Sequence, residues 1–244
     1  MSRVALLTLS ALVILAVPVW LPVNALTVRS SETMKQSAPF ARCFQDAELS
    51  ENIGTLKLQG GSDTAKASDF LLSRAKAAPG CRAQVVHALI AGLERASQQT
   101  TNKNESYFFW ENGASLLADL NAIEALDLLI ANIDLTDGWS ASISAAHFPA
   151  LVAVVRIGTP AIPKLQMVLH ADSNAIRRKF AAFCLGYIGG VQARKSLSTA
   201  VPDETDPCVK KFLRVSLRAF DNKAKPNHIS SALSGKWLSA FYCL

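Results

Sequence analysis

The chain has 244 residues and a formal net charge of +6, and half of its residues are hydrophobic. This length is enough for one well-buried domain or for one elongated array of repeats. No segment beyond the N-terminal region is apolar over the roughly 20 residues that a membrane-spanning helix needs, which excludes a protein with several spans.

The N-terminal region has the three parts of a secretory signal peptide. Arg3 lies in a short charged segment, Val4 to Val17 is uncharged and mostly apolar, and Ala25 offers a small residue for cleavage. The apolar run is too short to span a bilayer, and Pro18 interrupts it. We expect residues 1–25 to be cleaved and the protein to be exported to the periplasm or outside the cell. An uncleaved membrane anchor is the alternative.

Residues 26–60 are predicted to form a flexible leader followed by a segment that contains a cysteine. Beyond Gly60-Gly61, which breaks the chain, residues 61–98 indicate a pair of helices, Thr64 to Ala77 and Arg82 to Ala96. Pro79-Gly80 is expected to stop the first of them. This pair is either a divergent repeat or a cap.

Residues 104–222 are self-similar. Two sets of apolar residues recur in step, at spacings of 37, 31 and 32: Leu117, Val154, Leu185 and Leu217, and then Leu120, Ile157, Ile188 and Phe220. A loop that begins at Asp134 accounts for the longer first interval. Such self-similarity is the signature of a repeat protein.

The boundaries between these units contain helix signals. Thr159-Pro160 and Asp206-Pro207 each place a capping residue before a proline at the first helical position, and Gly189-Gly190 is typical of a helix end. No stretch alternates polar and apolar residues over a convincing length. We therefore predict an all-α protein with little or no β-structure, in which residues 223–244 fold back as a C-terminal cap.

The clearest unit, Asp172 to Gly189, resembles a HEAT repeat of the short form seen in phycobilin-lyase-like proteins. It has an Asp, an Arg at 178, an Ala-Ala pair and the ending Leu-Gly-x-Ile-Gly. The resemblance covers residues 107–222, with weaker copies around the strong unit. It implies an α-solenoid of stacked antiparallel helix pairs, with its short second helices, residues 160–169 and 191–200, along a concave surface.

On this resemblance, Lys164, Arg194 and Lys195 are candidates for contacts with a partner protein. The alternative is that they are ordinary solvated charges. A second candidate is a basic line that would dock an anionic surface or polysaccharide; its residues are Arg177, Lys179, Lys210, Lys211, Arg214 and Arg218. The alternative for these residues is the outer face of an amphipathic helix. We do not expect a nucleic-acid partner, because no aromatic side chains alternate with these cations as stacking platforms.

The five cysteines would meet an oxidising compartment after export, where disulfides persist. Their sequence positions allow 15 arrangements of two bridges. We predict bridges between Cys43 and Cys81 and between Cys208 and Cys243, with Cys184 as a small buried side chain. A reactive thiolate at Cys208, which would begin a helix, is the alternative there.

No recognised catalytic motif, phosphate-binding loop or metal-ligand pair is present, so we expect neither cofactor nor metal. Asn104 lies in a glycosylation sequon that matters only in a eukaryotic secretory pathway. The sequence thus favours a non-enzymatic scaffold that binds another protein. Two alternatives stay open, a binder of polyanions that uses the basic C-terminal part and an enzyme accessory of the lyase-like type.

Overall fold

The computed structural model describes residues 43–99, 103–136 and 145–221. Within these ranges the protein is all-helical and contains no strand, which confirms the predicted fold class. No single helix there is long and apolar enough to cross a membrane, and one sharply bent pair passes that test by length and composition alone. The predicted signal peptide, leader and C-terminal cap lie outside the described residues.

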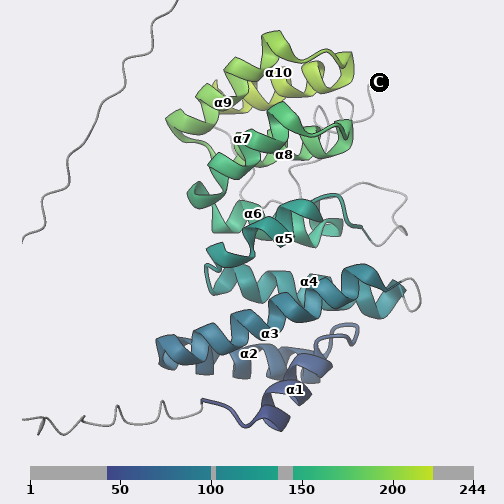
Figure 1. The fold of residues 1–244 in the computed structure, drawn as a ribbon, viewed down its shortest axis with the longest axis vertical. Coiled ribbons are helices and arrows are strands. Elements are labelled where there is room, and N and C mark those ends of the chain that lie inside the picture. Colours follow the sequence, from purple (N-terminus) through teal and green to yellow (C-terminus); the bar gives the residue numbers. More distant parts are fainter. Residues whose placement is uncertain (1–42, 100–102, 137–144, 222–244) are drawn as a thin grey trace, which may run out of the picture. The chain divides into compact units, whose positions relative to one another are not determined.

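Ten α-helices follow one another in the described ranges (Figure 1), and short 3-10 turns at Ile123–Ala125, Ala145–His147 and Thr159–Ala161 precede the fifth, sixth and seventh of them. They are α1 (Asp46–Thr55), α2 (Ser62–Ala77), α3 (Pro79–Gln98), α4 (Lys103–Asp119), α5 (Leu126–Ala131), α6 (Pro149–Ile157), α7 (Ile162–Ala171), α8 (Ala175–Ile188), α9 (Gly190–Asp203) and α10 (Pro207–Asp221).

Two predicted boundaries are wrong. Pro79-Gly80 does not stop a helix; it begins α3, and the break is at Ala78, whose backbone is extended. Proline is tolerated at the first position of a helix, because the N–H group of a residue there has no hydrogen-bond acceptor within the helix. Thr159 caps no helix, since it lies inside a 3-10 turn and its side chain accepts no capping hydrogen bond. The turn there is made by Gly158.

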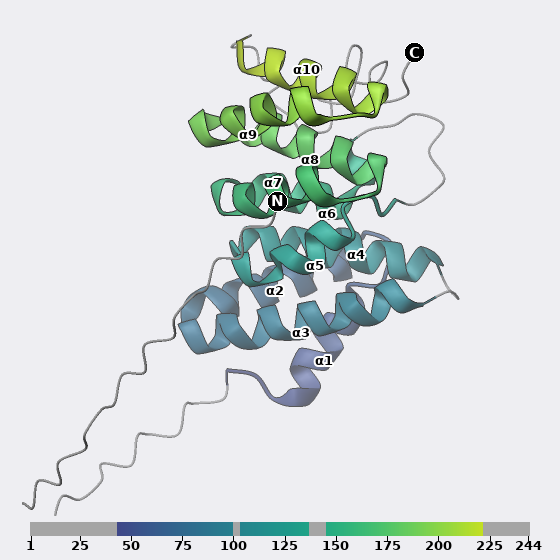
Figure 2. The same ribbon diagram turned by 45° about the horizontal axis from the view of Figure 1, so that its top comes forward.

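The helices pack in layers. From α4 onward the first helices of the units contact in series, α4 with α6, α6 with α8 and α8 with α10, and the second helices do so too, α5 with α7 and α7 with α9. Figures 1 and 2 both show these helices following one another in chain order. The first set of recurring apolar residues explains the layering, since Leu117, Val154 and Leu185 are fully buried and Leu217, in the last helix, is half-buried.

A backbone feature recurs at the same spacings as the side chains. Asn121, Gly158 and Gly189 all have positive φ, at 47°, 78° and 76°, and they are separated by 37 and 31 residues. Each one ends a first helix and turns the chain toward the second. Positive φ is costly for most L-residues and easy for glycine, and Asn is one of the few side chains that tolerates it. The repeat is therefore visible in the backbone itself.

The starts of α8 and α10 share a two-step cap. Asn174 Oδ1 accepts hydrogen bonds from two N–H groups of α8, and Asp172 Oδ1 accepts one from the N–H of Asn174 at 2.7 Å. In α10, which begins 32 residues later, Asp206 is the cap, and Glu204 Oε1 accepts from the N–H of Asp206 at 2.8 Å. The predicted cap at Asp206 is confirmed, and the helix N–H groups that would otherwise lack partners are satisfied.

The predicted bridge between Cys43 and Cys81 is present. It joins Cys43, three residues before the start of α1, to the first turn of α3. Cys184 is free and fully buried, as expected. Cys208 is also disulfide-bonded; its predicted partner, Cys243, lies outside the described residues, so that pairing stays a prediction.

The role of the positive-φ turn residues can be tested by substitution. A Cβ at Gly158 would come no closer than 3.8 Å to any neighbouring atom, so replacing this residue with Ala adds backbone strain without a steric clash. Its φ of 78° and ψ of −132° lie where only glycine is comfortable. We expect Gly158→Ala to lower the free energy of unfolding by about 2 kcal/mol, measured by urea denaturation.

Gly54 is the matched control. It lies inside α1 in open space, and its φ is not positive. Gly54→Ala should stabilise the protein by up to about 1 kcal/mol, because Ala has the higher helix propensity. Equal effects of the two substitutions would contradict the role given to the Gly158 turn.

Candidate functional site

A groove lies between α1, α3 and α4, with a volume of about 340 Å³. Its apolar surface comes from Leu49 and Ile53 on α1, from small residues on one face of α3, and from Phe109 on α4. Gly92 shows how α3 and α4 approach, since a Cβ there would lie 2.5 Å from Phe109 Cζ. Gly92 therefore lets Phe109 pack closely against α3, and the small residues Ala88, Ala91 and Ala96 of the same helix line the groove.

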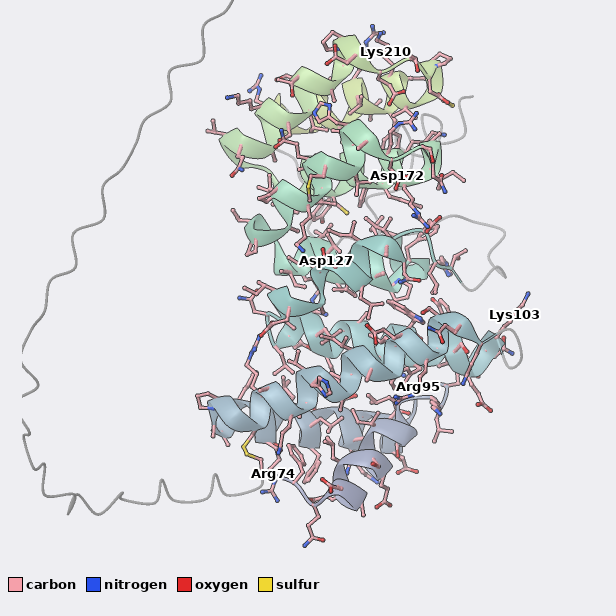
Figure 3. All side chains as sticks on the ribbon, in the orientation of Figure 1. Arg74, Arg95, Lys103, Asp127, Asp172 and Lys210 are labelled. Atoms are coloured by element: carbon pink, nitrogen blue, oxygen red, sulfur yellow. A yellow bond between two sulfur atoms is a disulfide. The ribbon has the colours of Figure 1, made fainter. Side chains whose placement is uncertain are left out.

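The rim of the groove is polar. Lys57, Arg95 and Glu105 are exposed at its edge, and Ser106 Oγ donates a hydrogen bond to Gln99 Oε1 at 3.2 Å. Figure 3 labels Arg95 on the C-terminal half of α3. Within the described part of the chain, Lys57 and Arg95 make no ion pair. The rim thus offers two cations to an anionic group.

The partner-contact candidates lie elsewhere, on the layer of second helices. Lys164 on α7 forms an ion pair with Asp127 on α5, so part of its charge already stabilises the stack. Lys195 occupies the equivalent position on α9, 31 residues later, and is exposed, as is its neighbour Arg194. No carboxylate in the described ranges pairs with Lys195.

The basic line is only partly at the surface. Lys179 is buried, at 8% exposure, so it cannot join a docking face. Burial lowers the pKa of Lys179, although the nearby Asp206 carboxylate acts in the opposite direction. Arg177 lies 3.7 Å from carboxylate oxygens of both Asp134 and Asp172 and so belongs to a local network.

The remainder of the predicted basic line is on α10. Lys210 is half-buried and its Nζ donates to the backbone oxygen of Pro202 at 3.4 Å. Lys211, Arg214 and Arg218 are exposed. The line is therefore a feature of α10 alone. The sequence pattern predicted a longer line that included residues of α8, and it is shorter because Lys179 of α8 is buried.

A largely buried ion pair connects α8 to the turn before α10. Arg178 Nε and Nη2 donate to the two carboxylate oxygens of Glu204 at 2.8 and 3.0 Å, and Arg178 Nη1 donates to the backbone oxygen of Asp172 at 2.8 Å. The side chains are 14% and 6% exposed. Burial alone would raise the pKa of Glu204, but the hydrogen bonds from Arg178 and from the Asp206 N–H outweigh it and lower that pKa.

Three exposed apolar residues occupy equivalent positions in successive units, at or just before the starts of the second helices. Ile123, Pro160 and Val191 each stand two residues after a positive-φ turn residue, and their spacings are again 37 and 31. Ile123 is 50% exposed and Val191 is 88% exposed; Pro160 is exposed as well. We call these three residues the exposed apolar column. Its residues lie just before α5 and α7 and at the start of α9, and these three helices contact one another in that order.

The described residues contain no group of three or more potential metal ligands. Burial raises the pKa of the Cys184 thiol strongly, so this cysteine is not a ready nucleophile. The alternative of a reactive thiolate at Cys208 is wrong, because that sulfur is in a disulfide. What the described geometry offers is a groove and exposed surfaces suited to binding.

No family model, curated protein or solved structure matches the chain. The resemblance of residues 172–189 to a HEAT repeat therefore remains a prediction. The sequence did not predict the groove, because its walls come from three helices, α1, α3 and α4. The pattern that could have indicated it is a set of small residues on one face of α3: Ala88, Ala91, Gly92 and Ala96.

The Arg178–Glu204 pair gives a prediction about pH. A carboxyl with a lowered pKa in the folded state contributes stability above its unfolded pKa and loses it as pH falls through the folded value. Glu204→Gln should cost about 3 kcal/mol at pH 7, because it leaves the Arg178 charge without its partner. Below about pH 4 the difference from the unmodified protein should shrink. Urea unfolding over a pH series measures both.

The control is the more exposed pair of Arg156 with Asp119. Asp119→Asn should cost less than about 1 kcal/mol, since solvent screens pairs of this exposure. A pH-independent effect of Glu204→Gln would show that packing, rather than charge, is what the substitution removes.

Proposed function

We propose that the protein is an exported, non-enzymatic scaffold of HEAT-like helix pairs that binds another protein. The observation that carries the proposal is the recurrence of a positive-φ turn at Asn121, Gly158 and Gly189, in step with buried apolar residues. Units that repeat in both backbone and core are typical of helical solenoids, which present extended binding surfaces. The disulfide between Cys43 and Cys81 supports export, because such bonds persist in oxidising compartments.

The surface proposed for the partner is the exposed apolar column together with the charges one helical turn further on. Packed helices lie about 8–10 Å apart, and one three-residue turn of a polyproline II helix rises about 9 Å. A partner segment in the polyproline II conformation, with an apolar residue at every third position on one face, would therefore meet Ile123, Pro160 and Val191 in turn. Lys195, beside Val191, favours an acidic residue at that end of the segment.

The test is capture of partners by the purified protein in extracts of the compartment to which it is exported, with identification of each retained protein. Val191→Asp places a charge in the exposed apolar column, and the pair Arg194→Glu and Lys195→Glu reverses the adjoining charge. Each variant should reduce retention of the same partner by about tenfold or more, because desolvated apolar contacts and complementary charges are lost.

Lys103→Glu is the control for a change of charge alone, since Lys103 is exposed at the start of α4 (Figure 3), a helix that contains no residue of the exposed apolar column. Partner retention that is unchanged by both Val191→Asp and the double reversal would refute this surface. Capture that falls only with Arg214→Glu and Arg218→Glu, and falls further as salt rises, would favour the polyanion-binding alternative on α10.

A further inference from the structure

The groove between α1, α3 and α4 is distinct from the surface proposed for a protein partner. Its floor is formed by the buried residues Ile53, Gly92 and Phe109, and the half-buried residues Leu49, Ala88 and Ala91 line its sides. Its volume of about 340 Å³ is within the range of cavities that hold small molecules, about 300–1,000 Å³. A pocket with an apolar floor and a few charged groups at its mouth is the common form of such sites.

The chemistry of the groove favours an occupant without a polypeptide backbone. An extended peptide would bring unpaired N–H and C=O groups onto an apolar floor, which is costly. The polar side chains near the floor are few, and Ser106 is already bonded to Gln99. A single unbranched hydrocarbon chain has no such groups to satisfy.

The charges at the rim of the groove determine which head group the bound molecule can have. Lys57 follows the end of α1 and Arg95 comes from α3, so the two cations stand on different walls of the groove. Within the described residues neither has a carboxylate partner, whereas most of the cations between the repeat units do. Glu105 is the opposing charge at this rim. The net positive rim favours an anionic head group.

We infer that this groove binds a fatty acid anion, with the acyl chain over Phe109 and the carboxylate at Lys57 and Arg95. The interaction is reversible and involves no covalent step. Each methylene buried along the floor strengthens binding about fourfold, so affinity rises with chain length until the groove is filled. Salt weakens the contact of the head group, which is exposed to solvent.

The experiment uses the purified protein with its Cys43–Cys81 bridge intact and measures dodecanoate binding by calorimetry, below the micelle concentration. We expect one molecule bound per chain, about sixteenfold tighter than decanoate, which is two methylenes shorter. Dodecyltrimethylammonium, with the same chain and the opposite charge, should bind at least tenfold more weakly. Equal binding of the two dodecyl compounds would overturn the assignment of the head group.

Two variants locate the site. Ala91→Phe fills the groove and should abolish binding, whereas Ala83→Phe, on an exposed position of the same helix, should leave it unchanged. Arg95→Glu changes an exposed side chain and should weaken binding at least tenfold, and Glu105→Gln should strengthen it. Because Arg95 is exposed, the Arg95→Glu variant is expected to fold, and it tests the site even if the Ala91→Phe variant does not fold. Dodecanoate binding that survives Arg95→Glu and Ala91→Phe would place the ligand elsewhere.

Discussion

Each helix pair in this protein has an apolar stripe that it cannot bury by itself, and the rest of the structure depends on how that stripe is covered. Leu117, Val154 and Leu185 are buried because the helices of one unit contact those of the next. For that contact to repeat, each unit must turn the chain between its two helices at a corresponding position. The residues Asn121, Gly158 and Gly189 lie at these turns and all have positive φ, and side chains 31 or 37 residues apart recur in step with them.

Charges then fix the units to one another where apolar packing alone would allow sliding. Asp119 pairs with Arg156, and Asp127 pairs with Lys164, both across a separation of 37 residues. Arg178 reaches the turn before α10 and binds Glu204. Most of these pairs are partly exposed and add little energy each. Their directional geometry specifies the register, and the buried Arg178–Glu204 pair is the most demanding of them.

Much of the fold could be predicted from the sequence because it depends on local spacing. The recurrence of apolar residues revealed the repeat, the cap at Asp206 was evident from Asp-Pro, and the bridge of Cys43 with Cys81 was correctly chosen. The errors came from tertiary context. Lys179 looked like a surface cation, but it is covered once α8 is packed, and Pro79 is compatible with either the end of one helix or the start of the next. The groove depends on three helices at once, which no local pattern describes.

The disulfide affects how this stack can come apart. The main contacts of α1 are with α2 and α3, and a helix with few neighbours is among the first parts of a structure to detach. Here Cys43 and Cys81 close a covalent ring that contains α1 and α2. The bridge limits how far a detached α1 can move from α3, so α1 loses less conformational entropy when it packs again. A single proteolytic cut between the two cysteines would likewise release no fragment. α1 can therefore detach from its neighbours, or the chain beside it can be cut once, without the loss of this part of the protein.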